Sequence, residues 1–250
     1  MFYIKLILRE LCVTRQTLRF LILLVLSVHT VSSYGQNPKI KNLPKYEFEP
    51  LHFGFSIGIN KTNFVITPKI LSDSILVVES SPKNGFNLGI ITEMAIHRYV
   101  TVRFVPNLSF AQRNIDFTIA TQKGVGVFTK KIESTFLDFP IDIKLRSARM
   151  NNFSAYVLAG IKYTIDLASQ KNVDNTSLDI SKQVIKLNRN DIGYEMGAGA
   201  EFYLPYFKFA IEGKLSLGFK NLLVNDNTIF ANAIDRLYSK IFLLSFTFEG

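Results

Sequence analysis

Two aspartates, Asp138 and Asp142, come closest in this sequence to a catalytic pair by type and spacing. Paired carboxylates act as acid and base in glycoside hydrolysis, where they stand up to about 9.5 Å apart. Four residues along a β-strand span roughly 13 Å, at about 3.3 Å each, so this pair is too widely spaced. The spacing predicts separate ion pairs with neighbours such as Lys144, because buried charges need partners.

The other candidates for chemistry do not converge on a site. The histidines have neither metal-ligand spacing nor a Ser–His–Asp order around them, and they are His29, His52 and His97. Three glycines near one another lack the strand–turn–helix context of a phosphate loop, and they are Gly193, Gly197 and Gly199. The sequence therefore predicts no catalytic residue, no cofactor-binding residue and no metal ligand.

The first 35 residues have the pattern of a signal peptide. Four bases and one acid precede a short apolar run, 20–28, and small residues lead to a predicted cleavage after Gly35. The alternative is a membrane-anchoring helix, but the run is about half of the roughly 20 residues that a span needs. The only cysteine, Cys12, leaves with this segment, so the mature chain has no thiol chemistry.

Charge excludes one class of partner. The chain carries 29 Lys and Arg against 20 Asp and Glu, and removing the signal peptide leaves 25 against 19, a net charge of +6. The excess is small and dispersed, which does not indicate nucleic-acid binding. Residues 36–50 are polar and contain three prolines, so they read as an irregular arm before the folded body.

The elements that must position the charged residues are eight segments in which oily and small or polar residues alternate. In the first, Phe53, Phe55 and Ile57 interleave with Gly54 and Ser56. Side chains alternate sides in a strand, so each segment has one oily face. The predicted strands are 51–64, 85–96, 100–113, 132–145, 153–167, 191–204, 207–219 and 237–248.

Connections between these strands alternate in length. Long ones are predicted at 65–84, 114–131, 168–190 and 220–236, and short ones between them. Outer-membrane barrels have short periplasmic turns and long external loops. An even number of strands then leaves both termini, and the arm 36–50, in the periplasm.

A sheet in lipid must close, because hydrocarbon cannot satisfy the backbone groups of an open edge. We therefore predict an all-β fold, an eight-stranded antiparallel up-and-down transmembrane barrel over 51–250. The alternative is a soluble β-sandwich or lipocalin-like barrel whose oily face points inward. Glycine and small residues on the opposite face, and tyrosines near strand ends, favour the membrane barrel.

The inner face of this barrel carries balanced charge. Its predicted bases are Arg103, Arg113, Lys144, Lys162, Lys208, Lys214 and Lys220. Its predicted acids are Glu93, Asp138, Asp142, Asp166, Glu195, Glu201 and Glu212. An eight-stranded barrel is just wide enough for side chains to fill, so we expect paired charges and no open pore. Pro106 and Pro140 each predict a bulge or a locally unpaired position.

Several segments resemble the PorT family, also called SprT, of Bacteroidetes. They are Pro50–Asn60 (PLHFGFSIGIN), Val102–Phe110 (VRFVPNLSF), Leu137–Lys144 (LDFPIDIK), Ala159–Ser169 (AGIKYTIDLAS) and Gly193–Lys208 (GYEMGAGAEFYLPYFK). The resemblance covers essentially the whole mature chain, although the fourth-strand pattern alone is shared by many Bacteroidetes barrels. It implies an outer-membrane component that protein export by the type IX secretion system requires, and that supports gliding motility in gliding species. It brings no catalytic residues.

The expected partners are other type IX secretion components and outer-membrane lipid, with no nucleic acid, no small-molecule substrate and no cofactor. Two alternatives stay open. One is a structural or adhesive surface barrel that works through its long loops. The other is an outer-membrane lipid or peptide enzyme, which would need His52 within reach of Ser56 and a carboxylate.

Overall fold

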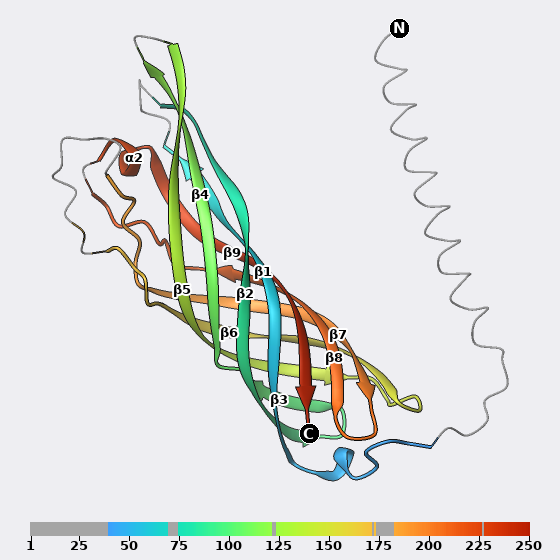
Figure 1. The fold of residues 1–250 in the computed structure, drawn as a ribbon. Helices are drawn as coiled ribbons and strands as arrows, with labels where there is room; N and C mark the ends of the chain where they lie inside the picture. Colours follow the sequence, from blue (N-terminus) through green and yellow to red (C-terminus); the bar gives the residue numbers. More distant parts are fainter. Residues whose placement is uncertain (1–39, 70–74, 122–123, 172, 174–182, 227) are drawn as a thin grey trace, which may run out of the picture. The chain divides into compact units, whose positions relative to one another are not determined.

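The described part of the chain folds into nine β-strands that form one closed sheet in this computed structural model (Figure 1). The structure describes residues 40–250 apart from 70–74, 122–123, 172, 174–182 and 227. The predicted signal peptide, 1–35, and the start of the arm, 36–39, lie outside the described residues. Lys41–Gly250 form one compact unit.

Every strand pairs antiparallel with its neighbours. The strands are β1 (Leu51–Pro68), β2 (Ile75–His97), β3 (Val100–Phe104), β4 (Asn107–Thr121), β5 (Gly124–Arg146), β6 (Phe153–Asp166), β7 (Asn190–Tyr203), β8 (Lys208–Gly218) and β9 (Ile234–Glu249). Two short helices accompany them, η2 (Tyr46–Phe48), which is a 3-10 helix, and α2 (Ile229–Asn232).

Hydrogen bonding runs completely around the barrel. The order is β1-β9-β8-β7-β6-β5-β3-β2, and β2 pairs back with β1 to close the ring. β3 and β4 share one position in the ring, because both pair with β2 on one side and β5 on the other. The nine strands therefore occupy eight positions around the barrel wall, here called staves. The predicted up-and-down antiparallel barrel is confirmed.

Two prolines explain why β3 and β4 are separate. The pairing with β5 jumps from Phe104↔Ile141 to Asn107↔Asp138. Pro106 lies in this gap on one strand, and Pro140 lies in it on the other, one position away from the residue directly opposite Pro106. Proline has no N–H to give to the ladder, so the two share one locally unpaired point, as the sequence predicted.

The two ends of the barrel differ. Short connections meet at one end, here called the turn end, at 98–99, 147–152 and 204–207, where Gly250 also lies. The other end, here called the loop end, carries the connections 69–74, 122–123, 167–189 and 219–233.

The outward side chains form an apolar belt around the staves. On β1 the alternate residues from Leu51 to Ile59 point outward, and Ile59 is 60% exposed. On β5 the same belt runs from Phe139 to Leu145. Nine or so residues are enough for a tilted membrane crossing, which needs roughly 9–11. The oily face thus points out, and the lipocalin-like alternative, in which it points in, is wrong.

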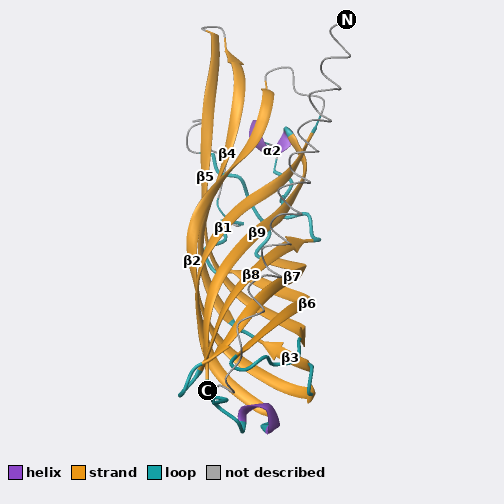
Figure 2. Ribbon diagram, turned by 90° about the vertical axis from the view of Figure 1, so that its right-hand side faces the viewer, coloured by secondary structure: helices purple, strands orange, loops and turns teal. Residues whose placement is uncertain are grey.

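Two of the predicted long loops are mostly strand. The segments expected at 65–84 and 114–131 extend β1 and β2, and β4 and β5, far past the belt. They lack a continuous oily face, which hid them from the alternation pattern, but strand ladders need only backbone partners. β2, β4 and β5 reach beyond the ends of β6–β8 in Figures 1 and 2. We call this three-stranded projection, 75–83, 111–121 and 124–135, the blade.

The other two connections are long, as predicted, and their described residues form no strand of the barrel. The chain between β6 and β7 spans 167–189, and that between β8 and β9 spans 219–233 and contains α2. An isolated bridge between Leu187 and Leu223 ties them together. The hydroxyl of Thr228 caps α2 by accepting from the Ala231 N–H at 3.2 Å. β6–β9 begin and end within three residues of the predicted strands.

Candidate functional site

A layer of charged side chains fills the middle of the barrel. Arg103 of β3 is 1% exposed and lies among three carboxylates. Its Nη1 donates to Glu212, its Nε lies 3.3 Å from Glu93, and its Nη2 lies 3.8 Å from Glu249. The hydroxyl of Tyr156 donates to Glu212 at 2.6 Å. Strands from all around the ring thus meet on one guanidinium.

Two lysines extend this layer toward the turn end. Lys144 Nζ lies 2.7 Å from Glu93 and 2.6 Å from Glu201. Lys208 Nζ lies 2.6 Å from Glu249 and 3.0 Å from Glu201. Glu201 and Glu249 are each shared by two cations and Glu93 by three, which satisfies several of their lone pairs. Such shared pairing is what buried ions require.

The two aspartates singled out from the sequence do not face a common substrate. Asp138 accepts from the Thr164 hydroxyl at 2.5 Å and lies 3.7 Å from Lys162. Asp142 instead lies 3.9 Å from Lys214. Both side chains are buried in the lumen. Both aspartates thus lie beside separate lysines in the lumen, as predicted, but Lys144 is not one of those lysines, because its ammonium pairs with Glu93 and Glu201.

The arm lies across the turn end of the lumen and leaves a pocket of about 240 Å³ between η2 and the charged layer. η2 places the Tyr46 ring in the mouth, 6% exposed, with its hydroxyl donating to Glu249 at 3.1 Å. The ring stacks on His52 at 3.7 Å and covers the Lys208 ammonium at 4.7 Å. Burial raises the pKa of the Tyr46 hydroxyl, with the neighbouring Glu249 charge as the next cause. The hydroxyl therefore stays protonated at neutral pH and remains a hydrogen-bond donor.

The arm is anchored to the barrel rim by one arginine. Arg149 donates to the carbonyl oxygens of Asn42 and Leu43 and lies over the Tyr203 ring at 3.8 Å. The Asn42 amide N–H donates to the Asn152 side chain at 2.9 Å. The sequence predicted an irregular arm over 36–50 before the folded body, and it gave no sign that the arm packs on the barrel. The described part of the arm contains η2, and its backbone carbonyls accept hydrogen bonds from the rim.

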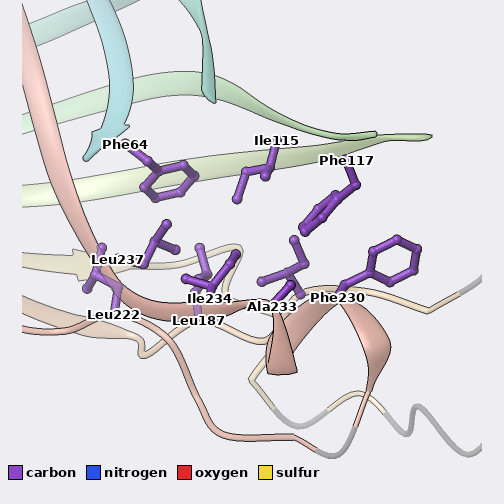
Figure 3. Packing of buried hydrophobic residues seen from close by; sticks show 10 residues of the cluster. Phe64, Ile115, Phe117, Leu187, Leu222, Phe230, Ala233, Ile234 and Leu237 are labelled. Atoms are coloured by element: carbon purple, nitrogen blue, oxygen red, sulfur yellow. The ribbon is translucent and has the colours of Figure 1, made fainter. Parts of the chain in front are cut away.

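An apolar cluster fills the loop end of the lumen (Figure 3). Phe64 of β1 and Ile115 and Phe117 of β4 point inward to meet residues from the two irregular connections and β9. Its buried members are Phe64, Ile115, Phe117, Ile185, Leu187, Leu222, Phe230, Ala233, Ile234 and Leu237. Phe117 and Phe230 pack edge to face at 4.9 Å. The connections therefore fold into the barrel mouth as a lid.

Arg113 marks the boundary between the charged layer and the apolar cluster. Its guanidinium lies 4.1 Å from the Phe64 ring and 4.9 Å from the Phe136 ring, and donates to Ser134 at 2.7 Å. A cavity of about 20 Å³ beside it has room for about one water. Within the described residues, side chains thus fill the lumen at three successive levels, which are Tyr46, the charged layer and the apolar cluster.

Most of the predicted inner face is correct, with one error, Lys220, and two omissions, Lys130 and Glu249. All seven predicted acids and six of the seven bases are buried. Lys220 is exposed, because β8 ends at Gly218 and the chain leaves the lumen there. Glu249 was missed although it is 1% exposed, since it is the last residue of the last strand. The alternation of Phe246 and Phe248 with Thr247 and Glu249 was the signal available.

The site that an enzyme would need does not assemble around His52. Its Nε2 lies 2.9 Å from the Tyr46 carbonyl oxygen, and its ring is stacked. Within the described residues no group of three or more His, Cys, Asp and Glu side chains has the arrangement of a metal site. No helix in the described part of the chain has the length and apolar character to cross a membrane.

Comparison with known proteins agrees with this architecture. The model of the family described as "Outer membrane protein beta-barrel domain" matches residues 35–224. No curated protein sequence matches the chain.

Solved structures with a similar fold include Ail of Yersinia pestis, at 16% identity and TM-score 0.37, covering 81% of this chain and 100% of Ail. OprG of Pseudomonas aeruginosa matches at 13% identity and TM-score 0.40, covering 80% of this chain and 94% of OprG. The N-terminal barrel domain of Pseudomonas aeruginosa OprF matches at 10% identity and TM-score 0.34, covering 78% and 97%.

Proposed function

Because this chain belongs to the outer membrane β-barrel domain family, we propose that it serves protein export by the type IX secretion system as a non-enzymatic accessory or assembly component. The resemblance of its strands to the PorT family supports this role. We further propose that residues 1–35 are a cleaved signal peptide, that 36–50 form a periplasmic arm, and that 51–250 form the membrane barrel.

The observation that carries the proposal is the filled lumen. The Tyr46 ring, the charged layer around Arg103 and the apolar cluster around Phe117 leave no route for a polypeptide through the barrel. A barrel of this kind can support export only from outside its own lumen, by contacts of its wall, turns, arm or blade. Its partners would then be other components of the secretion machinery.

Chain direction supports a proposed orientation in the membrane. An even number of staves returns the chain to the side on which it began, and the turn end carries both η2 and Gly250. Outer-membrane barrels keep short turns in the periplasm and longer connections outside. We therefore place the arm in the periplasm and the blade outside the cell.

Deletion of the gene tests the proposal directly. Type IX cargo should disappear from the medium and accumulate in the periplasm, while an unrelated outer-membrane barrel stays correctly inserted. Expression of the wild-type chain from a plasmid should restore secretion. Normal cargo secretion by the deletion strain would show that the assignment is wrong.

A structural or adhesive surface barrel is the second candidate, and the blade favours it. The blade reaches past the apolar belt, where a surface protease can cut it. In that case, shaving intact cells should abolish adhesion while secretion of cargo continues. If the export proposal is correct, deletion of the gene should abolish cargo secretion before it affects adhesion.

A further inference from the structure

The two long edges of the blade differ in how their unpaired backbone groups are protected from pairing with another strand. The β2 edge, 75–82, faces the end of β1, where the Ser80 hydroxyl accepts from the Phe64 N–H at 3.2 Å and donates to Asn63 at 2.5 Å. Pro82 removes one donor from the same edge. Side-chain bridges and prolines are common ways of protecting an edge strand. The β2 edge is therefore already blunted.

The β5 edge, here Val125–Glu133, contains no proline, and within the described residues no side-chain bridge like that of Ser80 covers its backbone. Pairing with β6 stops at Phe136↔Asp166, while pairing with β4 continues without a shift to Thr121↔Gly124. The Leu167 N–H donates to the Thr135 carbonyl at 2.8 Å, so the backbone groups of Thr135 point away from β4. By strand alternation, those of the odd-numbered residues from Val125 to Glu133 point the same way. Among the described residues, no backbone group pairs with them.

Side chains along this edge make it a template for another strand. Val125 and Val127 are 68% and 66% exposed, and the edge contains no proline. The apolar end of the edge offers a pairing surface, whereas Lys131 and Glu133 place charges along the rest, which disfavours unselective pairing. The edge is therefore suited to a strand whose charges complement those two residues.

The edge lies outside the apolar belt, which excludes lipid as its occupant. Above Leu137 the outward side chains of β5 become Thr135, Glu133, Lys131 and Thr129. The neighbouring outward residues of β4 are also polar, and they are Gln112, Asn114, Asp116 and Thr118. The blade therefore stands in water, where hydrogen bonds from a second polypeptide can satisfy the edge.

The blade is held ready for binding by a polar clasp across its three strands. Asp116 of β4 accepts from the Ser81 hydroxyl of β2 at 2.5 Å and from the Thr129 hydroxyl of β5 at 2.6 Å. A pre-ordered edge costs less entropy to bind than a flexible one.

We propose that the β5 edge binds an extended segment of a different polypeptide by β-augmentation. In this mode the main chain supplies affinity and alternate side chains supply specificity. An antiparallel segment would place apolar residues opposite Val125 and Val127, an acid opposite Lys131 and a base opposite Glu133. The inference stands without the export assignment, because it concerns a surface and not the cellular role.

Charge pattern argues against a second copy of this chain as the occupant. A two-fold antiparallel pair that uses the whole edge aligns Val127 with Lys131 and Val125 with Glu133. Such an arrangement places apolar side chains opposite charges and brings no opposite charges together. A different segment with the complementary order fits better.

The test uses the full mature barrel in detergent and a fluorescent nine-residue peptide, KTETTTVTV, with a scrambled peptide of the same composition as control. V127P removes an N–H that points away from β4, so the β4–β5 ladder keeps its bonds. V127T keeps the N–H and is the matched control. We expect saturable binding by the wild type, a change below twofold for V127T, and at least a tenfold loss for V127P.

A disulfide version reads out the register even if V127P fails to fold. The mature chain has no cysteine, so V127C is its only thiol. A peptide with cysteine in the position opposite Val127 should cross-link faster than one with the cysteine two residues away. Absence of saturable wild-type binding, equal binding of the scrambled peptide, equal cross-linking in both registers, or V127C dimers in place of peptide adducts would each overturn the proposal.

Discussion

The charged layer and the apolar cluster fill neighbouring stretches of the same lumen by opposite means. Arg103 and its carboxylates depend on pairing, because any charge left alone in the interior is costly. Phe117 and its neighbours depend on contact area and dense packing. The first is built from strand residues alone, whereas the second needs chain from two connections folded inward. Side chains of the barrel wall thus fill one stretch of the lumen, and side chains of the connections help to fill the other.

Arg103→Met should produce the largest loss of stability. The substitution leaves Glu93, Glu212 and Glu249 without the cation that joins them, and breaking a buried pair costs roughly 3–5 kcal/mol. To measure the loss, the barrel is refolded and its unfolding in urea is monitored by circular dichroism. A midpoint equal to that of the wild type would mean that the charged layer does not stabilise the fold.

Phe117→Ala should lower the free energy of unfolding slightly less than Arg103→Met does, and its effect should be confined to the apolar cluster. Removing a buried aromatic ring costs about 3–5 kcal/mol where the site cannot collapse, and here neighbouring side chains of the cluster can partly fill the space. Limited proteolysis should cut the connections 167–189 and 219–233 sooner, while the wall keeps its protection against hydrogen exchange. Equal loss of protection in the wall would contradict a separate loop-built lid.

Glu195→Gln should weaken the charged layer without opening it. The Lys214 ammonium, 2.8 Å from Glu195 in the wild type, keeps a polar partner of the same shape but loses the charge. We expect a loss of about 1–3 kcal/mol in unfolding free energy. Current recordings of this variant should stay at the baseline, and a steady current would show that one pair holds the lumen closed.

Asp116→Asn should have the smallest effect, confined to the blade. Hydrogen bonds from Ser81 and then Thr129 lower the pKa of Asp116. A lowered folded pKa means that the carboxylate stabilises the blade above its ordinary pKa and that this is lost as pH falls through the folded value. We expect less than about 1 kcal/mol at neutral pH, because the group is near the surface. The difference between wild type and variant, measured by amide exchange in 111–121, should vanish in acid.

The barrel and its charged layer could be predicted from the sequence, because alternation is local and acts through the same period in every strand. Six of the seven predicted bases are buried for that reason, and Lys220 failed because its strand ends two residues earlier. The apolar cluster could not be predicted. Its members Ile185 and Leu187 lie outside the barrel strands and Phe230 lies in the one-turn helix α2, and neither segment is long enough for a period to mark which side chains turn inward.

The arm and the blade were missed for a different reason. Tyr46 follows no periodic pattern, and its place in the mouth depends on Arg149 and His52, which are distant in the sequence or on another element. The blade strands carry polar residues on their outer face, so they resemble loops by composition. Their β structure follows from pairing with one another, which composition does not encode.

Recording current from the wild-type barrel in planar lipid bilayers tests the filled lumen most directly. Insertion is verified first by the protection of the apolar belt from protease. With Tyr46, the Arg103 layer and the Phe117 cluster in place, we predict no steady conductance above that of protein-free bilayers. Large, stable, single-channel steps from the wild-type protein would contradict the account.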